Sequence, residues 1–493
     1  MAGADGMGDV DFDLLVIGGG VNGTGIARDA AGRGLRVLLV ERDDLASHTS
    51  ASSTKLIHGG LRYLEYFEFR LVREALSERE TLLDIAPHLI SPMRFVMPLA
   101  KGMRPAWLIR AGLFLYDHIG GRSRLPGSIA VRLDRTQWGA GLKPVRRGFV
   151  YSDGWVDDAR LVVLNALDAA EHGADIRTRT GFEGARREGD RWVARLGDGG
   201  GVTARAIVNT AGPWVGKVLE TMPQAQAERP PRLVKGSHII VPRLFDGDHA
   251  YILQNEDRRI VFAIPYEGAF TLIGTTDKPF TGDPSAPRID ADETAYLCQS
   301  VNRYFTRQIG AGDVVASYSG VRPLFDDGHA KASEVTRDYV LRLGTREAPQ
   351  LLSAFGGKIT TYRRLAEHAL EQLEPFLPPM GKPWTASAPL PGGDLPDGDF
   401  AAFLASVRRR WPFLGAITAA RMAHAYGTRI ERVLGDATAL DDLGAGLSTR
   451  EVEYLVAHEW ARTADDILWR RTKLGLHGGA ALRERVQAYL DLP

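Results

Sequence analysis

The order of hydrophobic and polar positions near the start of the chain predicts a β-strand, a helix and a second β-strand. Residues 14–17 form a continuous apolar run, which is typical of a strand buried on both faces of a sheet. Ile26, Ala27 and Ala30 then place small apolar side chains at helical spacing, and residues 36–40 form a second strand-like run. This order indicates a parallel β–α–β unit and an α/β fold.

Glycines at the first strand–helix junction add chemistry to this unit. Gly18, Gly20 and Gly23 form the pattern G-x-G-x-x-G. The first permits a tight turn, the second leaves room for a pyrophosphate, and the third lets the helix pack close to the strand. Glu41, at the end of the second strand, can accept hydrogen bonds from ribose hydroxyls. The alternative is an ordinary glycine-rich turn, but the complete context favours a dinucleotide site.

Three later segments have loop or turn patterns that suit the same ligand. Residues 47–54 are rich in Ser, Thr and His and offer hydroxyls and backbone N–H groups to a phosphate or a flavin ring, or form a plain polar loop. A strand over 206–209 ends at Thr210-Ala211-Gly212. Residues 351–362 read as a strand, a Gly-Gly turn and a helix start with Lys358 at its mouth, which is a second place suited to an anion.

The remaining pattern predicts further domains. Residues 233–277 alternate as antiparallel strands, a suitable floor for a substrate pocket. Residues 61–83 predict one amphipathic helix, and residues 399–493, which follow a Pro- and Gly-rich linker, are expected to be helical. A chain of 493 residues exceeds one core, so we expect two or three domains.

Composition excludes several classes of protein. The net charge of zero gives no global field that favours nucleic acid. The single Cys298 excludes an internal disulfide framework and a cysteine-based metal site, and no metal is expected. Residues 1–11 lack the basic and apolar parts of a signal peptide. No apolar run is long enough to predict a membrane-spanning helix.

Residues 101–147 concentrate positive charge, with ten Lys or Arg residues against Asp117 and Asp134. Within them, residues 106–116 are mainly apolar and include Trp107 and Tyr116. Apolar bulk with interfacial aromatic residues and a basic surround suits a face resting on anionic lipid. The alternative is a buried helix whose arginines lie on its solvent side.

Several motifs together resemble the FAD-dependent (aerobic, respiratory) glycerol-3-phosphate dehydrogenase family. The resemblance runs from about residue 10 to the C-terminus. The motifs are Gly18–Gly25 with Glu41, and residues 52–65, 151–161, 235–238, 273–277, 318–323 and 355–362.

The resemblance implies a glutathione-reductase-like FAD-binding domain with an inserted antiparallel β substrate domain, followed by an all-helical C-terminal domain. The FAD-binding domain would comprise residues 10–80, 148–232 and 318–388. The substrate and membrane-facing domain would comprise residues 81–147 and 233–317, and the helical domain residues 394–493.

The resemblance also implies an activity. FAD would be the cofactor, sn-glycerol 3-phosphate would be oxidised to dihydroxyacetone phosphate, and electrons would pass to a membrane quinone. The protein would be cytoplasmic and peripherally associated with the inner face of the membrane, with residues 101–147 on anionic lipid. A homodimer is one candidate for the assembly of the protein. The alternatives are a glycerol-3-phosphate oxidase using O₂, another amino-acid-oxidase-type flavoenzyme, and a non-catalytic nucleotide sensor.

Hydride transfer requires a base for the C2 hydroxyl proton, and His238 is the candidate because the ordinary histidine pKa is ~6.5. Arg62, Tyr63 and Arg337 are predicted to bind substrate. The two arginines are candidates for the phosphate, since a planar guanidinium matches phosphate oxygens. Arg322 could serve the phosphate or the C2 oxygen, and Lys358 the flavin edge or the substrate anion. Each arginine could instead form a surface ion pair, and His238 could be structural. The residues predicted to contact FAD are Gly18, Gly20, Gly23, Glu41, Arg42, Ser50, Ser53, His58, Gly59, Ala211, Gly212, Gly356, Gly357, Ile359 and Thr360.

Overall fold

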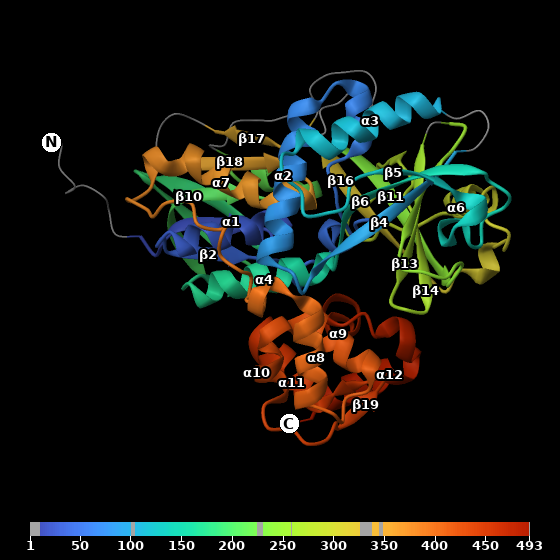
Figure 1. Cartoon of the computed structure of the whole chain (residues 1–493). Coiled ribbons are helices and arrows are strands. Elements are labelled where there is room, and N and C mark those ends of the chain that lie inside the picture. The colour runs from blue at the N-terminus through green and yellow to red at the C-terminus, as the bar shows by residue number, and fades with distance from the viewer. Residues whose placement is uncertain are drawn as a thin grey trace.

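A computed structural model describes residues 10–99, 104–223, 230–257, 259–325, 338–344 and 349–492. These residues form two mixed β-sheets and a separate group of C-terminal helices (Figure 1). The predicted Arg337 lies outside the described residues.

The first sheet has the order β17–β18–β10–β1–β2–β7, with β8 and β9 extending it from β10. Strand β1 pairs in parallel with β2 and β10, and β10 pairs in parallel with β18. The carboxyl ends of these strands therefore meet at one edge. The strands are β1 (Phe12–Ile17), β2 (Val37–Val40), β7 (Asp175–Arg177), β8 (Phe182–Glu188), β9 (Arg191–Leu196), β10 (Gly201–Asn209), β17 (Val340–Leu343) and β18 (Gln350–Phe355).

Strand β1 is buried on both faces, as its apolar run predicts. Leu14 and Val16 pack in a core with helices α1 (Val21–Gly32), α4 (Asp158–Glu171) and α7 (Tyr362–Leu373). The side chains of Leu15 and Ile17 pack on the other face with Trp192. Helix α1 is thus fixed against the sheet, and its N-terminus points to the edge where the strands end.

The second sheet has the order β15–β11–β14–β13–β12–β4–β6–β3, with β16 on β11 and β5 on β6. Strands β11 to β14 pair antiparallel, which agrees with the pattern over 233–277. The strands are β3 (Leu56–Ile57), β4 (Ile90–Pro98), β5 (Ile129–Arg132), β6 (Arg147–Val156), β11 (Arg232–Pro242), β12 (Ala250–Gln254), β13 (Ile260–Tyr266), β14 (Phe270–Gly274), β15 (Lys278–Pro279) and β16 (Ala316–Leu324). Helix α6 (Ala291–Asn302) covers part of this sheet.

Two strands of the second sheet begin the segments predicted for the FAD-binding domain. Strand β6 lies at the start of 148–232, and β16 at the start of 318–388. The domain division remains a proposal, and sheet membership supports moving both boundaries to the ends of these strands.

The helix predicted over 61–83 is interrupted. A 3₁₀ helix, η2 (Leu61–Tyr66), is followed by helix α2 (Phe69–Ile85). Phe67 between them has a φ of 60°, a left-handed conformation that ends a helix. The apolar spacing continues across this break, which is why the pattern alone indicates one element. Helix α3 (Ala106–Ile119) packs against α2 and η2.

The C-terminal region has its own hydrophobic core. It is helical as predicted, except for a short hairpin of β19 (Asp442–Gly444) and β20 (Leu447–Ser448). Its helices are α8 (Phe400–Arg410), α9 (Ala416–Tyr426), α10 (Ile430–Leu434), α11 (Thr449–Glu459), a π-helix (Asp466–Arg471) and α12 (Gly475–Leu490). In Figure 1 this group, orange to red, lies below α4 and on the opposite side of the molecule from α3.

None of the helices among the described residues combines the length and apolar character needed to cross a membrane.

Glu267, in the turn between β13 and β14, is surrounded by charged groups from other segments. Burial and Asp157 raise the pKa of Glu267 to about 7, against the opposing effect of Lys473, Lys55 and Arg421. An acid with a higher pKa in the folded protein holds its proton more tightly there. The free energy of unfolding therefore falls as pH rises from 4.5, the ordinary value, through about 7.

Glu267→Gln should remove this pH-dependent loss of stability. We expect the difference in Tm, variant minus wild type, to be about 1–3 °C larger at about pH 8 than at about pH 5. Thermal unfolding followed by circular dichroism at several pH values checks this. A difference in Tm that stays constant with pH would contradict it.

Candidate functional site

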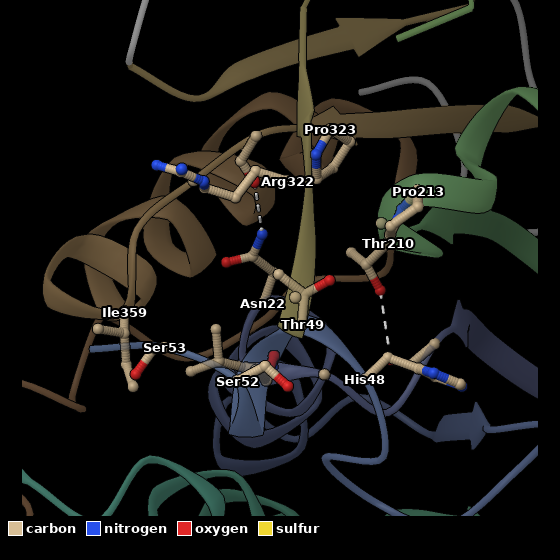
Figure 2. A pocket seen from close by; sticks show the side chains of 18 of the residues that line it. Asn22, His48, Thr49, Ser52, Ser53, Thr210, Pro213, Arg322, Pro323 and Ile359 are labelled. Atoms are coloured by element: carbon tan, nitrogen blue, oxygen red, sulfur yellow. Dashed lines mark hydrogen bonds between the residues drawn. The ribbon is translucent and has the colours of Figure 1, made fainter. Parts of the chain in front are cut away.

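A cavity of about 770 Å³ lies where the carboxyl ends of β1, β10 and β18 face strands β11 and β16 of the second sheet. Segments far apart in the sequence line it. Figure 2 shows Asn22, the loop residues Thr49, Ser52 and Ser53, and Arg322 around this space.

The glycine turn after β1 is packed so closely that side chains would not fit. Gly18 has a φ of 110°, and a Cβ there would lie 2.7 Å from the Thr210 carbonyl oxygen. A Cβ on Gly23 would lie 2.0 Å from the Gly18 carbonyl oxygen. The absence of side chains therefore brings α1 against β1 and turns the helix N-terminus, with Gly20 and Val21, toward the cavity.

The end of β2 carries the predicted ribose acid. The Glu41 carboxylate accepts hydrogen bonds from the Gly19 N–H at 2.6 Å and the Asp43 N–H at 2.9 Å, and burial raises its pKa. Nearby, the Arg42 guanidinium lies 3.9 Å from the centre of the Trp214 ring. An acid held at a strand end beside a cation and an aromatic wall suits a ribose and an adenine ring.

Two further turns complete the cavity wall beside α1. The Thr210 hydroxyl donates to the Ile17 carbonyl at 2.8 Å and fixes the turn that contains Ala211 and Gly212. The Asn22 side-chain amide donates to the Gly356 carbonyl at 3.1 Å. Both β10 and β18 are therefore tied to the glycine turn of β1. This arrangement has the glycine cradle, the acid at the strand end and the cavity that FAD requires.

Most predicted site residues line this cavity. They are Gly18, Gly20, Glu41, Arg42, Ser50, Ser53, His58, Arg62, Tyr63, Ala211, Gly212, His238, Arg322, Gly356, Gly357, Lys358, Ile359 and Thr360.

Gly59, which is predicted to contact FAD, is not among the residues that line the cavity. Its N–H donates to the Tyr116 hydroxyl at 2.8 Å, and a Cβ there would lie 2.5 Å from the Leu76 side chain. Gly59 therefore faces the hydrophobic core. Ser53 lines the cavity, but its hydroxyl donates to the Asp158 carboxylate at 2.7 Å, so it also fixes the loop.

Positive charge gathers at the opposite end of the cavity from Glu41 and Arg42. The Lys358 Nζ is buried, lies 3.9 Å from the centre of the Tyr63 ring, and has no hydrogen-bond partner among the described residues. Burial and Lys358 lower the pKa of His58 to about 4. Arg322 pairs with Asp277 at 3.1 Å, and its side chain is 42% exposed. Arg62 lines the same wall. This end can receive an anion.

His238 on β11 is fixed in the wall of the cavity. Its Nε2 lies 3.0 Å from the Thr54 hydroxyl, and its ring stacks on Tyr318 with centroids 4.7 Å apart. A Cβ on Gly274 would lie 1.9 Å from the ring. Burial, Lys55 and Arg322 lower the pKa of His238 to about 3. The imidazole is therefore neutral near pH 7, and the surrounding positive charge makes it a weak base until an anion offsets that charge.

Sequence reasoning missed several residues of the site. Asn22 occupies a variable position of the glycine motif, and Trp214 follows the Thr-Ala-Gly turn. Asp277 ends a motif that carries the resemblance, and Thr54 lies inside the polar loop. The motifs mark the segments, but only the fold shows which of their side chains turn inward.

Comparison with known proteins agrees with this geometry. The family model "FAD dependent oxidoreductase" matches residues 13–363, and "C-terminal domain of alpha-glycerophosphate oxidase" matches residues 383–492. The chain belongs to the FAD-dependent oxidoreductase family. Its cofactor is FAD, and the predicted fold class is confirmed.

Within this family, the chain is similar to dehydrogenases that are named for phosphorylated polyols. A glycerol-3-phosphate dehydrogenase of Pseudomonas aeruginosa is 54% identical over 490 residues, which covers 97% of this chain and 95% of the relative. A D-erythritol 1-phosphate dehydrogenase of Brucella abortus is 51% identical and covers 97% of both chains. The structure of a Bacillus halodurans glycerol-3-phosphate dehydrogenase complexed with FAD is 27% identical, with a TM-score of 0.74, and covers 97% of this chain and 89% of that one. The resemblance stated from the motifs is thereby confirmed.

Gly23→Ala should abolish FAD binding, because the new Cβ would overlap the Gly18 carbonyl oxygen at 2.0 Å and push α1 from the sheet. We expect the purified variant to lack the flavin absorbance at about 450 nm. Gly112→Ala in α3 is the control, since no atom lies within 4 Å of that Cβ. A Gly23→Ala protein with full flavin content would contradict this role.

Proposed function

We propose that the protein oxidises sn-glycerol 3-phosphate to dihydroxyacetone phosphate and passes the electrons to a membrane quinone. The observation that carries this proposal is the buried Lys358 ammonium beside Tyr63, which has no hydrogen-bond partner among the described residues. A cation so placed in a family of flavoenzymes suits an anionic substrate. Relatives that are 54% and 51% identical are dehydrogenases of polyol phosphates.

Different side chains bind the phosphate, remove the proton and stabilise the charge that develops. Lys358 and Arg62 bind the phosphate, and Tyr63 supports Lys358 through its ring face. FAD, held by the glycine turn and Glu41, would supply the acceptor for the C2 hydride. His238, neutral and held by Thr54 and Tyr318, takes the C2 hydroxyl proton. Arg322, close enough to lower the pKa of His238, stabilises negative charge on the C2 oxygen.

Anaerobic addition of sn-glycerol 3-phosphate to the purified protein should bleach the flavin band. In Lys358→Met the kcat/KM for this reduction should fall about 100-fold, since a charged hydrogen bond to phosphate is lost, while FAD content stays unchanged. Stopped-flow absorbance measures both proteins. Lys278→Met is the matched control, because Lys278 is exposed at the sheet edge and pairs with Asp290.

The same experiment separates the alternatives. No bleaching by sn-glycerol 3-phosphate would overturn the substrate, and stronger bleaching by D-erythritol 1-phosphate would favour the activity of the Brucella relative. Reoxidation by O₂ as fast as by a soluble quinone would favour an oxidase. Equal kcat/KM in wild type and Lys358→Met would remove Lys358 from the phosphate site.

The exposed side chains of helix α3 favour binding of the protein to a membrane surface. Ile109 and Leu113 pack inward, whereas Trp107 is 72% exposed and Leu108 and Phe114 also project outward. Phe67, which follows η2 beside α3, is 77% exposed. We call these four outward residues (Phe67, Trp107, Leu108 and Phe114) the aromatic face. Three of its four residues lie within the basic segment 101–147, and this exposed apolar bulk favours the lipid alternative over a buried helix. The homodimer remains a prediction.

Replacing Phe67, Trp107, Leu108 and Phe114 by Ser should weaken binding to vesicles that contain phosphatidylglycerol at least about tenfold, because each side chain contributes apolar area. Co-sedimentation measures the partition. Ile417→Ser is the control, since Ile417 is 87% exposed but lies in α9 on the far side of the molecule. Unchanged sedimentation of the fourfold variant would show that this face does not bind lipid.

A further inference from the structure

The C-terminal region binds the loop after Glu41 on the side that faces away from the cavity. The loop residues Glu41, Arg42, 46–50 and 52–54 line the FAD cavity. Asp44, in the middle of the loop, turns away from the cavity, and its side chain is only 2% exposed. A buried carboxylate requires partners. The side chains that donate hydrogen bonds to Asp44 lie more than 400 positions further along the chain, and Arg179 adds an ion pair at 4.0 Å.

Two consecutive arginines of the π-helix (Asp466–Arg471) bind this carboxylate. Arg471 donates to both Asp44 oxygens, at 2.7 and 2.8 Å, and Arg470 Nε donates at 2.6 Å. Arg471 is fully buried. Consecutive residues of a regular α-helix point in different directions, so the wider π-turn allows both guanidinium groups to reach one acid. Such turns are frequent at functional sites.

The arginines are themselves fixed. Arg471 also donates to the Glu459 carbonyl at 2.6 Å, and the Glu459 carboxylate accepts from Arg160 of α4 at 3.0 Å. Asp466 pairs with Arg470 and, at 2.5 Å, with Arg179. The C-terminal region therefore presents a rigid pair of donors to the loop.

The Asp44 contact determines the shape of the cavity wall. Asp43, its neighbour, donates its N–H to Glu41 at 2.9 Å. Ala46, which has a left-handed φ of 60°, donates to the Gly19 carbonyl at 3.2 Å. A left-handed alanine is strained and persists only where its surroundings impose it. Fixing Asp44 between these two contacts keeps both the ribose acid and the glycine turn in place.

We propose that Arg470 and Arg471 are positioning residues for FAD, and that the C-terminal region thereby preorganises the cofactor loop through Asp44. Without this ion pair the loop must be ordered when FAD binds, and that ordering weakens the affinity. The inference rests on FAD as the cofactor and is independent of the substrate.

The test measures the Kd for FAD of the deflavinated full-length protein by flavin fluorescence. Asp44→Asn and Arg471→Gln should each raise the Kd at least about tenfold. The double variant should resemble either single variant, because both remove one contact. Arg470→Ala is a second variant, in case Arg471→Gln does not fold. The Arg470 side chain is 19% exposed, so its loss should disturb folding less and should raise the Kd by a smaller factor.

Arg421→Gln is the matched control for general damage to the C-terminal region. Arg421 forms a buried ion pair with Glu451 within that region, at 2.6 Å, and does not contact Asp44. It should lower the Tm but change the Kd for FAD less than about twofold. If Asp44→Asn, Arg471→Gln and Arg470→Ala change the Kd no more than Arg421→Gln does, the role of the pair is structural only and the proposal is wrong. Because no substrate is used, failure here is distinct from failure of the proposed activity.

Discussion

The contact between the backbones of Gly23 and Gly18 is the constraint on which the rest of the site depends. Only the absence of a Cβ lets α1 approach β1 this closely, and this approach sets the direction of the helix N-terminus. Asn22 then reaches the β18 turn at the Gly356 carbonyl, and Thr210 reaches β1. Three strand ends therefore meet around one cavity, and the second sheet closes it with β11 and β16.

Charge in this cavity favours a neutral base before substrate binds. His238 is buried near Lys55 and Arg322, and both burial and these cations lower its pKa. An anionic phosphate beside Lys358 and Arg62 would offset positive charge and raise the pKa of the imidazole. Under the proposed function, substrate binding itself would thus make His238 a stronger base. The phosphate that Lys358 and Arg62 bind would thus raise the basicity of the group that removes the proton.

Local patterns predicted what depends on local chemistry. The β1–α1–β2 unit, the antiparallel strands over 233–277 and the helical C-terminal region follow from periodicity and glycine spacing. The break at Phe67 and the inward packing of Gly59 against Leu76 depend on tertiary contacts that spacing does not encode. The Asp44–Arg471 pair joins residues 427 positions apart, and nothing near Asp44 in the sequence marks it as buried. Long-range ion pairs of this kind require the fold.

The position of the cavity relative to the aromatic face bears on which electron acceptor the protein uses. The end with Glu41 and Arg42 lies in the loop held by the C-terminal region. At the other end, Arg62 and Tyr63 line the cavity from η2, and the same short segment leads to the exposed Phe67 beside α3. The substrate end therefore lies beside the segment that leads to the aromatic face, and Figure 1 places α3 and the C-terminal helices on opposite sides of the molecule. A protein resting on lipid through that face would bring the reactive end of FAD toward the bilayer, where a quinone resides. An acceptor dissolved in water would require no such placement, so the position of the aromatic face favours the quinone over O₂.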